Sequence, residues 1–150
     1  MEHRLPATTE MVRAFSELFV NRRAYTIQST RPHPESGRHY YYRPKGKNGT
    51  PSPGLTLDTV RRHLAGELTI GIYAINPETQ RCKWMAIDAD YRTALEDLIK
   101  VQRRLNDDGV AAALEKSKRG GHLWMFFDRP VLAREARIYI YLWLSSSMSR

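Results

Sequence analysis

The chain has 150 residues, 41% of them hydrophobic, and this size and composition predict one folded unit with an ordinary core. Lysine and arginine outnumber aspartate and glutamate by 24 to 16, which favours nucleic acid as a partner before an anionic membrane, or else a basic surface with no partner. The single cysteine, Cys82, excludes an intramolecular disulfide and a multi-cysteine zinc site, and we expect a cytoplasmic protein without a membrane span.

The first third of the chain predicts one helix and one hairpin. Thr8 or Thr9 can cap a helix that ends near Asn21, because apolar residues recur there at helical spacing. Residues 24–29 and 38–43 are β-prone and are separated by a proline-containing turn. Residues 44–54 hold Pro, Gly, Lys, Asn and Ser, and predict a mobile surface loop at the internal boundary between an accessory part, 1–54, and a core, 55–150.

In the rest of the chain the sequence predicts two helices, each followed by a pair of strands. A helix over 57–64 is followed by strands at 68–75 and 83–90, which we expect to pair as a hairpin. The clearest helix spans 91–108 and ends at Gly109, and two strands follow at 111–116 and 122–128. This order predicts an α+β fold, a mostly antiparallel sheet with packed helices on one face.

The last residues break this pattern. The β-branched and aromatic run 138–144 does not continue the amphipathic helix that begins at 131–137. We therefore expect a C-terminally incomplete or altered end.

Two carboxylates share one face of the strand at 83–90. Side chains alternate along a strand, so Asp88 and Asp90 project together and repel each other unless a cation lies between them. Mg²⁺ and Mn²⁺ prefer such oxygen ligands and are completed by substrate phosphates. The alternative is that both aspartates only begin the next helix, with Asp90 as its N-cap.

A glycine-rich basic turn is the second candidate feature. The glycines allow the backbone to approach a phosphate, Lys118 and Arg119 supply positive charge, and His122 begins an apolar strand whose face it shares with Trp124 and Phe126. If this strand neighbours 83–90, His122 lies beside the two aspartates. The alternatives are a plain hairpin turn and a structural histidine.

These features together resemble the archaeo-eukaryotic primase superfamily, particularly the primase domain of bacterial TOTE conflict-system proteins. The resemblance covers residues 55–130. Its aspartate-x-aspartate signature stands as Asp88, Ala89 and Asp90 after an apolar strand, and its small-x-histidine signature stands as Gly120, Gly121 and His122.

The resemblance implies a primase-polymerase catalytic core with an RRM-like fold, acting on nucleoside triphosphates and a DNA or RNA template. It implies that Asp88 and Asp90 hold Mg²⁺ or Mn²⁺ and are catalytic together with His122. It further implies that the incoming nucleotide's phosphates are bound by Ser117, Lys118, Arg119, Gly120 and His122. A helicase or nuclease partner is also implied.

Two departures from the family pattern bear on catalysis. Such primases need a third carboxylate on a later strand, and Asp128, which we expect in a loop, is a poor substitute. The cysteine cluster common in this family is absent, so no zinc knuckle is assigned.

Two rival hypotheses remain beside an enzyme. The same fold can serve as a non-catalytic nucleotide or single-strand binding module, in which Tyr40, Tyr41 and Tyr42 stack on bases or else only pack within their strand. A poorly folded gene remnant is the other.

Overall fold

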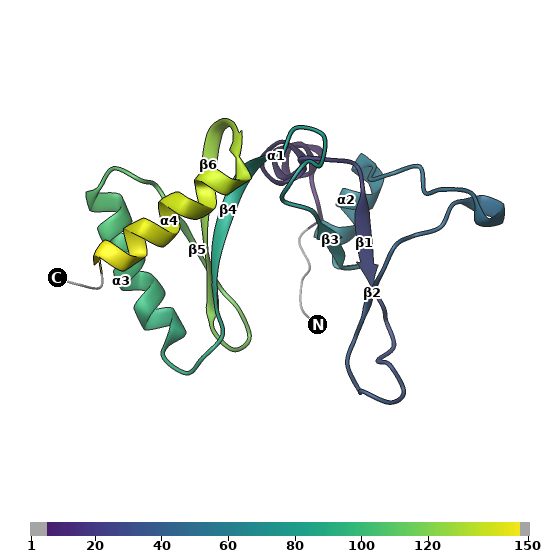
Figure 1. Cartoon of the computed structure of the whole chain (residues 1–150). Coiled ribbons are helices and arrows are strands. Elements are labelled where there is room, and N and C mark those ends of the chain that lie inside the picture. Colours follow the sequence, from purple (N-terminus) through teal and green to yellow (C-terminus); the bar gives the residue numbers. More distant parts are fainter. Residues whose placement is uncertain (1–5, 148–150) are drawn as a thin grey trace. The chain divides into compact units, whose positions relative to one another are not determined.

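The computed structural model describes residues 6–147 and divides into two compact units, Met1–Tyr73 and Ala74–Arg150 (Figure 1). Each unit has its own cluster of buried apolar residues. The prediction of one folded unit is therefore wrong, because the buried apolar residues form two separate cores, one in each unit. The two compact units meet after Tyr73, and Leu55, Val60 and Ile70 pack with Val12 in the N-terminal one.

The N-terminal unit packs two helices with a small antiparallel sheet. Its elements are α1 (Thr9–Phe19), β1 (Tyr25–Gln28), β2 (Tyr41–Tyr42), the short 3₁₀ helix η1 (Lys47–Gly49), α2 (Leu57–Leu64) and β3 (Ile70–Ile72). Thr8 caps α1 by accepting a hydrogen bond from the Met11 amide. The strand order is β2-β1-β3, so the predicted first hairpin is confirmed.

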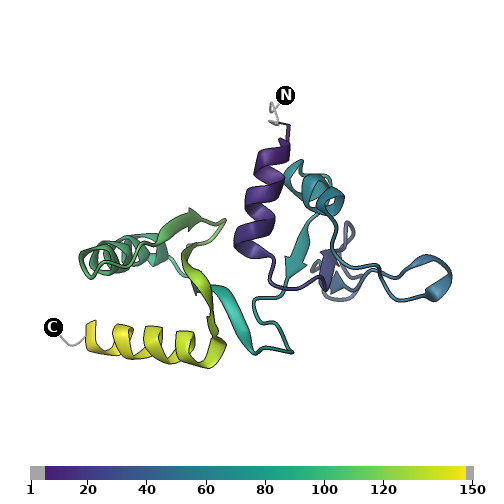
Figure 2. The ribbon, with the colours of Figure 1, turned by 90° about the horizontal axis from the view of Figure 1, so that it is seen from above.

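The C-terminal unit is a three-stranded antiparallel sheet with helices on one face. Its elements are β4 (Arg81–Ala89), α3 (Ala94–Asp107), β5 (Ala113–Lys116), β6 (Gly121–Leu132) and α4 (Ala133–Ser147). The strand order is β4-β6-β5. Leu98 and Leu105 of α3 pack on Leu123 and Met125 of β6, and both helices lie on the same side of the sheet (Figure 2). The expected helix-covered sheet is therefore present within this unit.

The predicted hairpin between residues 68–75 and 83–90 does not form. β3 instead pairs with β1, and β4 pairs with β6, so the two segments belong to different sheets. Around the Asn76 turn the chain is joined by an isolated bridge between Ile75 and Cys82 and by a 3.0 Å hydrogen bond from the Asn76 amide to the Arg81 carbonyl. Ile70 is drawn into the N-terminal core, whereas Ala89 belongs to the C-terminal core, so the two strands serve different clusters.

The end of the described chain is also more regular than its sequence indicates. α4 continues from Ala133 to Ser147, so the predicted break after Arg137 is wrong. Ile140 and Trp143 pack on the core, and the Trp143 indole N–H donates a 2.7 Å hydrogen bond to Asp108. These contacts outweigh the low helix propensity of the β-branched and aromatic residues.

Between residues 6 and 147, the structure contains no helix that is both long and apolar enough to cross a membrane.

Candidate active site

Strand register brings the predicted site residues together on one face of the C-terminal sheet. Asp88 of β4 lies directly opposite His122 of β6, and His122 lies opposite Glu115 of β5. Directly opposed residues of antiparallel strands point to the same face, so the three side chains form a row across the sheet. His122 was predicted to lie beside the aspartates if its strand pairs with the one that carries Asp88, and that pairing is confirmed.

This row lies on the face that α3 and α4 leave uncovered. The two helices pack on Met85, Ile87, Leu123 and Met125, whose side chains alternate with those of the row. On the uncovered face the Asp88 side chain is 73% exposed and that of His122 is 31% exposed. Trp84 and Trp124 lie on the same face, with ring centroids 5.2 Å apart in an edge contact.

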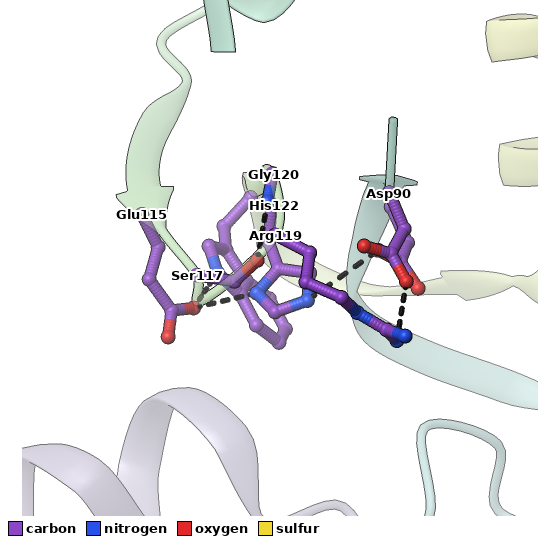
Figure 3. A network of polar contacts seen from close by, with 8 residues as sticks. Asp90, Glu115, Ser117, Arg119, Gly120 and His122 are labelled. Carbon is purple, nitrogen blue, oxygen red and sulfur yellow. Dashed lines mark hydrogen bonds and ion pairs between the residues drawn. The ribbon is translucent and has the colours of Figure 1, made fainter. Parts of the chain in front are cut away.

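Glu115 holds the histidine in one orientation. Its Oε2 accepts a 2.7 Å hydrogen bond from the Trp124 indole N–H and lies 3.1 Å from His122 Nδ1 (Figure 3). An ionised carboxylate only accepts, so Nδ1 must carry the proton, and Nε2 is the nitrogen that faces Asp88 Oδ1 at 3.5 Å. Glu115 was not predicted as a site residue, because strand alternation alone does not reveal which residue of β5 stands opposite His122.

The second aspartate pairs with the basic turn. Asp90 Oδ2 lies 2.5 Å from Arg119 Nη2, and Figure 3 shows this ion pair beside His122. Asp90 does not cap the following helix, which has Thr93 at its N-cap position. The alternative that Asp90 serves as an N-cap is therefore wrong.

The turn between β5 and β6 is built for close backbone approach. The Ser117 amide donates to the Gly120 carbonyl at 3.0 Å, and the Gly120 amide donates to Ser117 Oγ at 3.1 Å. A Cβ at Gly120 would overlap the Ala89 carbonyl, and one at Gly121 would lie 2.7 Å from the Glu115 carbonyl. Positions 120 and 121 therefore both require glycine, because neither has room for a side chain. The side chains of Lys118 and Arg119 are exposed on the turn.

The first turn of α3 carries its own polar cluster. The Lys100 ammonium, which donates to Asp97 at 3.1 Å, is the main cause of a lowered pKa for the Asp97 carboxyl, and the Tyr91 hydroxyl adds to it. The Tyr91 pKa is raised by desolvation first and by its bond to Asp97 second. These groups stabilise the start of α3, directly after Asp90.

Two other side chains are placed by the structure away from the row. Cys82 is 3% exposed, and burial raises the pKa of its thiol, so it packs as an apolar group. Asp128 lies within β6 and not in a loop as predicted, because β6 continues past it to pair Val131 with Cys82. Asp128 falls in the stretch between Phe126 and Val131 where the ladder with β4 is irregular.

The carboxylates suit a divalent cation that a substrate completes. Asp88 and Asp90 offer hard oxygen donors, and Mg²⁺ is commonly held by one or two carboxylates plus substrate phosphates. Within the part of the chain that the structure describes, no group of three or more His, Cys, Asp or Glu residues is arranged to hold a metal by itself. The donor set therefore fits a cation shared with a phosphate ligand and not a closed protein cage.

The comparisons with known proteins place the whole arrangement in one family. No curated protein sequence matches the chain. The family model for the archaeo-eukaryotic primase domain of the TOTE conflict system matches residues 10–150. The match spans residues of both compact units and includes Asp88 of β4, Asp90 just after it, and His122 of β6. The chain therefore belongs to the archaeo-eukaryotic primase domain family of the TOTE conflict system.

Proposed function

We propose that this protein is a primase-polymerase-type nucleotidyltransferase domain that binds a divalent metal, a nucleoside triphosphate and a DNA template on the uncovered face of β4, β6 and β5. The observation that carries the proposal is the row of Asp88, His122 and Glu115 beside the Asp90–Arg119 pair. Membership of a primase family suggests the reaction class. We further propose that the C-terminal unit is RRM-like in its fold.

Each side chain has a role in this proposal. Asp88 and Asp90 hold Mg²⁺ or Mn²⁺, which when bound neutralises phosphate charge. His122, oriented by Glu115 through Nδ1, faces the phosphates of the incoming nucleotide with its Nε2 atom. Ser117, Lys118, Arg119 and Gly120 surround the triphosphate tail, and Arg119 exchanges its bond to Asp90 for one to phosphate.

The proposed reaction is attack by a 3′-hydroxyl oxygen on the α-phosphorus. The new bond to the α-phosphorus forms as the bond from that phosphorus to the bridging oxygen breaks, pyrophosphate leaves, and the hydroxyl proton passes to water. Alignment of this displacement commonly takes three carboxylates, and within residues 6–147 no third carboxylate is grouped with Asp88 and Asp90 so that the three could hold a metal. We therefore expect metal-dependent nucleotide binding to be strong and nucleotidyl transfer by this chain alone to be impaired.

The deciding experiment is titration of the protein with a labelled nucleoside triphosphate, with and without Mn²⁺. Asp88→Asn together with Asp90→Asn removes both metal ligands with little change in shape. It also frees Arg119, which raises metal-independent attraction for phosphate, so the readout is the gain in affinity caused by Mn²⁺. We expect that gain in the wild type and its loss in the variant.

A matched control removes two negative charges elsewhere. Asp58 in the first turn of α2 and Asp107 at the end of α3 are exposed, and the double asparagine variant there should keep the full Mn²⁺ effect. A wild type that binds equally well without metal, or a site variant that keeps the effect, would refute the metal role.

A second candidate function is a non-catalytic nucleotide or single-strand binding module of the same fold. The exposure of Tyr40, Tyr41 and Tyr42, each between 45% and 51% exposed, favours it, because exposed aromatic rings can stack on bases. A pure binding module would bind oligonucleotide equally well with or without Asp88 and Asp90, and would lose affinity steeply with salt.

A further inference from the structure

The N-terminal unit contains a basic hollow that the proposed catalytic face does not use. It has a volume of about 880 Å³ and lies between the segment 22–25 and the loop 43–54. Its lining includes Arg22, Arg23, Arg43 and Lys45 and no acidic side chain. Four cations converge on one concavity without a compensating carboxylate in its wall, which is the electrostatic pattern of a polyanion site.

Arg22 is the most informative of these cations. Its Nε atom is buried and has no hydrogen-bond partner in the described structure, although buried donors are nearly always paired. Its guanidinium carbon lies 3.9 Å from the centroid of the Tyr73 ring, so a cation–π contact fixes the group in place. A fixed guanidinium with an unused buried donor at a basic hollow is suited to an anionic ligand.

The wall of the hollow is held in place by backbone contacts of the N-terminal unit. Gly54 has a φ of +85°, and a Cβ there would lie 3.0 Å from the Arg23 Cβ. The Leu55 amide donates a 2.6 Å hydrogen bond to the Arg23 carbonyl. Since Leu55 is 7% exposed in the N-terminal core, the far end of the loop is anchored against the segment that carries the arginines.

Aromatic residues lead to the hollow along β2. Tyr42 stands opposite Ile27, which shares a face of β1 with Tyr25, and Tyr25 lines the hollow. The Tyr40 and Tyr42 rings are 6.2 Å apart and are 50% and 45% exposed, and Tyr42 directly precedes Arg43. A positively charged groove continued by exposed aromatic rings is the pattern that binds single strands, because bases stack on the rings while phosphates meet the cations.

We propose that this hollow binds the phosphate backbone of a single-stranded nucleic acid, with Tyr40 and Tyr42 stacking on its bases. The site is separate in residues from the Asp88 and His122 row, and it requires neither a divalent metal nor a nucleoside triphosphate. It would therefore allow the chain to bind single-stranded nucleic acid independently of the proposed nucleotidyl transfer.

The test is fluorescence anisotropy of labelled oligo(dT) in EDTA, with the full chain. Arg43→Gln together with Lys45→Gln removes two exposed cations from the loop and should leave the fold intact. Affinity for single strands scales with salt to a power of about −0.7 per phosphate contact, so two lost contacts should weaken binding by roughly 25-fold at 0.1 M salt. The plot of log affinity against log salt should become shallower by about 1.4.

A charge-matched control separates this site from general attraction. Arg13→Gln with Arg103→Gln removes the same charge from exposed positions on α1 and α3, neither of which lines the hollow, and should change affinity far less. Tyr42→Ala tests the stacking contribution separately and should weaken oligo(dT) by more than it weakens a duplex of the same length. Circular dichroism verifies that each variant is folded.

Each outcome decides the proposal. Equal losses in the hollow and control variants would overturn it, as would an unchanged salt slope in the hollow variant. A hollow variant that loses nucleoside triphosphate affinity but keeps oligo(dT) binding would reassign the cations to free phosphate ligands. Because this assay contains EDTA, its failure leaves the Mn²⁺-dependent test of the catalytic face untouched, and the reverse also holds.

Discussion

Gly120 offers the sharpest test of how this site is built. A Cβ at this position would overlap the Ala89 carbonyl oxygen and lie 3.1 Å from the Ala94 Cβ. Both neighbours are rigid, since one is strand backbone and the other is fully buried. Gly120→Ala must therefore displace either the β5–β6 turn or the end of β4, and overpacking of this kind costs about 1–3 kcal/mol, with this case at the upper end.

Gly109 provides a control for the opposite reason. Nothing lies within 4 Å of a Cβ built there, but its φ is +79°, a conformation that alanine adopts at a cost of about 1–2 kcal/mol. Gly109→Ala thus measures conformational strain without crowding. Gly120 is not in the left-handed region, so Gly120→Ala measures crowding without that strain.

The assay is urea unfolding followed by tryptophan fluorescence. The protein's three tryptophans, Trp84, Trp124 and Trp143, all belong to the C-terminal unit, so the signal reports on that unit alone. If the free energy of unfolding falls by ~1 kcal/mol per M urea, Gly120→Ala should lower the urea midpoint of unfolding by about 3 M. Gly109→Ala should lower it by about 1 M. Gly120→Ala should also reduce nucleoside triphosphate binding, because the displaced backbone directly precedes Asp90. A midpoint for Gly120→Ala at or above that of Gly109→Ala would refute the crowding argument.

Two further predictions concern the polar clusters on either side of the site. Glu115→Ala should lower nucleotide affinity several-fold while costing at most ~1 kcal/mol in unfolding free energy, because it releases the half-buried His122 and Trp124 without opening the core, and Glu115→Gln should restore part of the loss. Unchanged affinity in both variants, by titration with labelled nucleotide, would contradict this. Asp97 has a lowered pKa, so its contribution to stability is present above its unfolded pKa of roughly 3.9 and is lost as the pH falls through the folded value. The stability difference between wild type and Asp97→Asn should therefore shrink between about pH 5 and pH 3 in urea titrations, and a difference that grows on acidification would contradict the sign.

Local sequence signals predicted most of the individual elements. Thr8 caps α1, Gly109 ends α3 with a positive φ, and the β1–β2 and β5–β6 pairs are the expected hairpins. Each of these features depends on a few neighbouring residues, so the sequence alone contains the information. The paired aspartates and the glycine-basic turn were visible for the same reason.

Features that depend on distant partners were mispredicted or missed. The segment 68–75 reads as a strand followed by a turn, which is the local pattern of a hairpin with the next strand, yet β3 joins β1 because Ile70 belongs to the other core. Residues 138–144 favour a strand by composition, and α4 forms because Ile140 and Trp143 find a core to cover.

The sequence by itself determined the chemistry available to this protein, namely two carboxylates, a histidine and a glycine-rich basic turn on strands and their connection. Only the tertiary structure decided which of these groups meet. Antiparallel register places Asp88, His122 and Glu115 in one row, and the β5–β6 turn places Arg119 where it forms an ion pair with Asp90. The physical reason is that a strand's alternation fixes the face on which a side chain lies, while its neighbours on that face are fixed by strand pairing, which for Asp88 and His122 joins residues more than thirty positions apart in the chain.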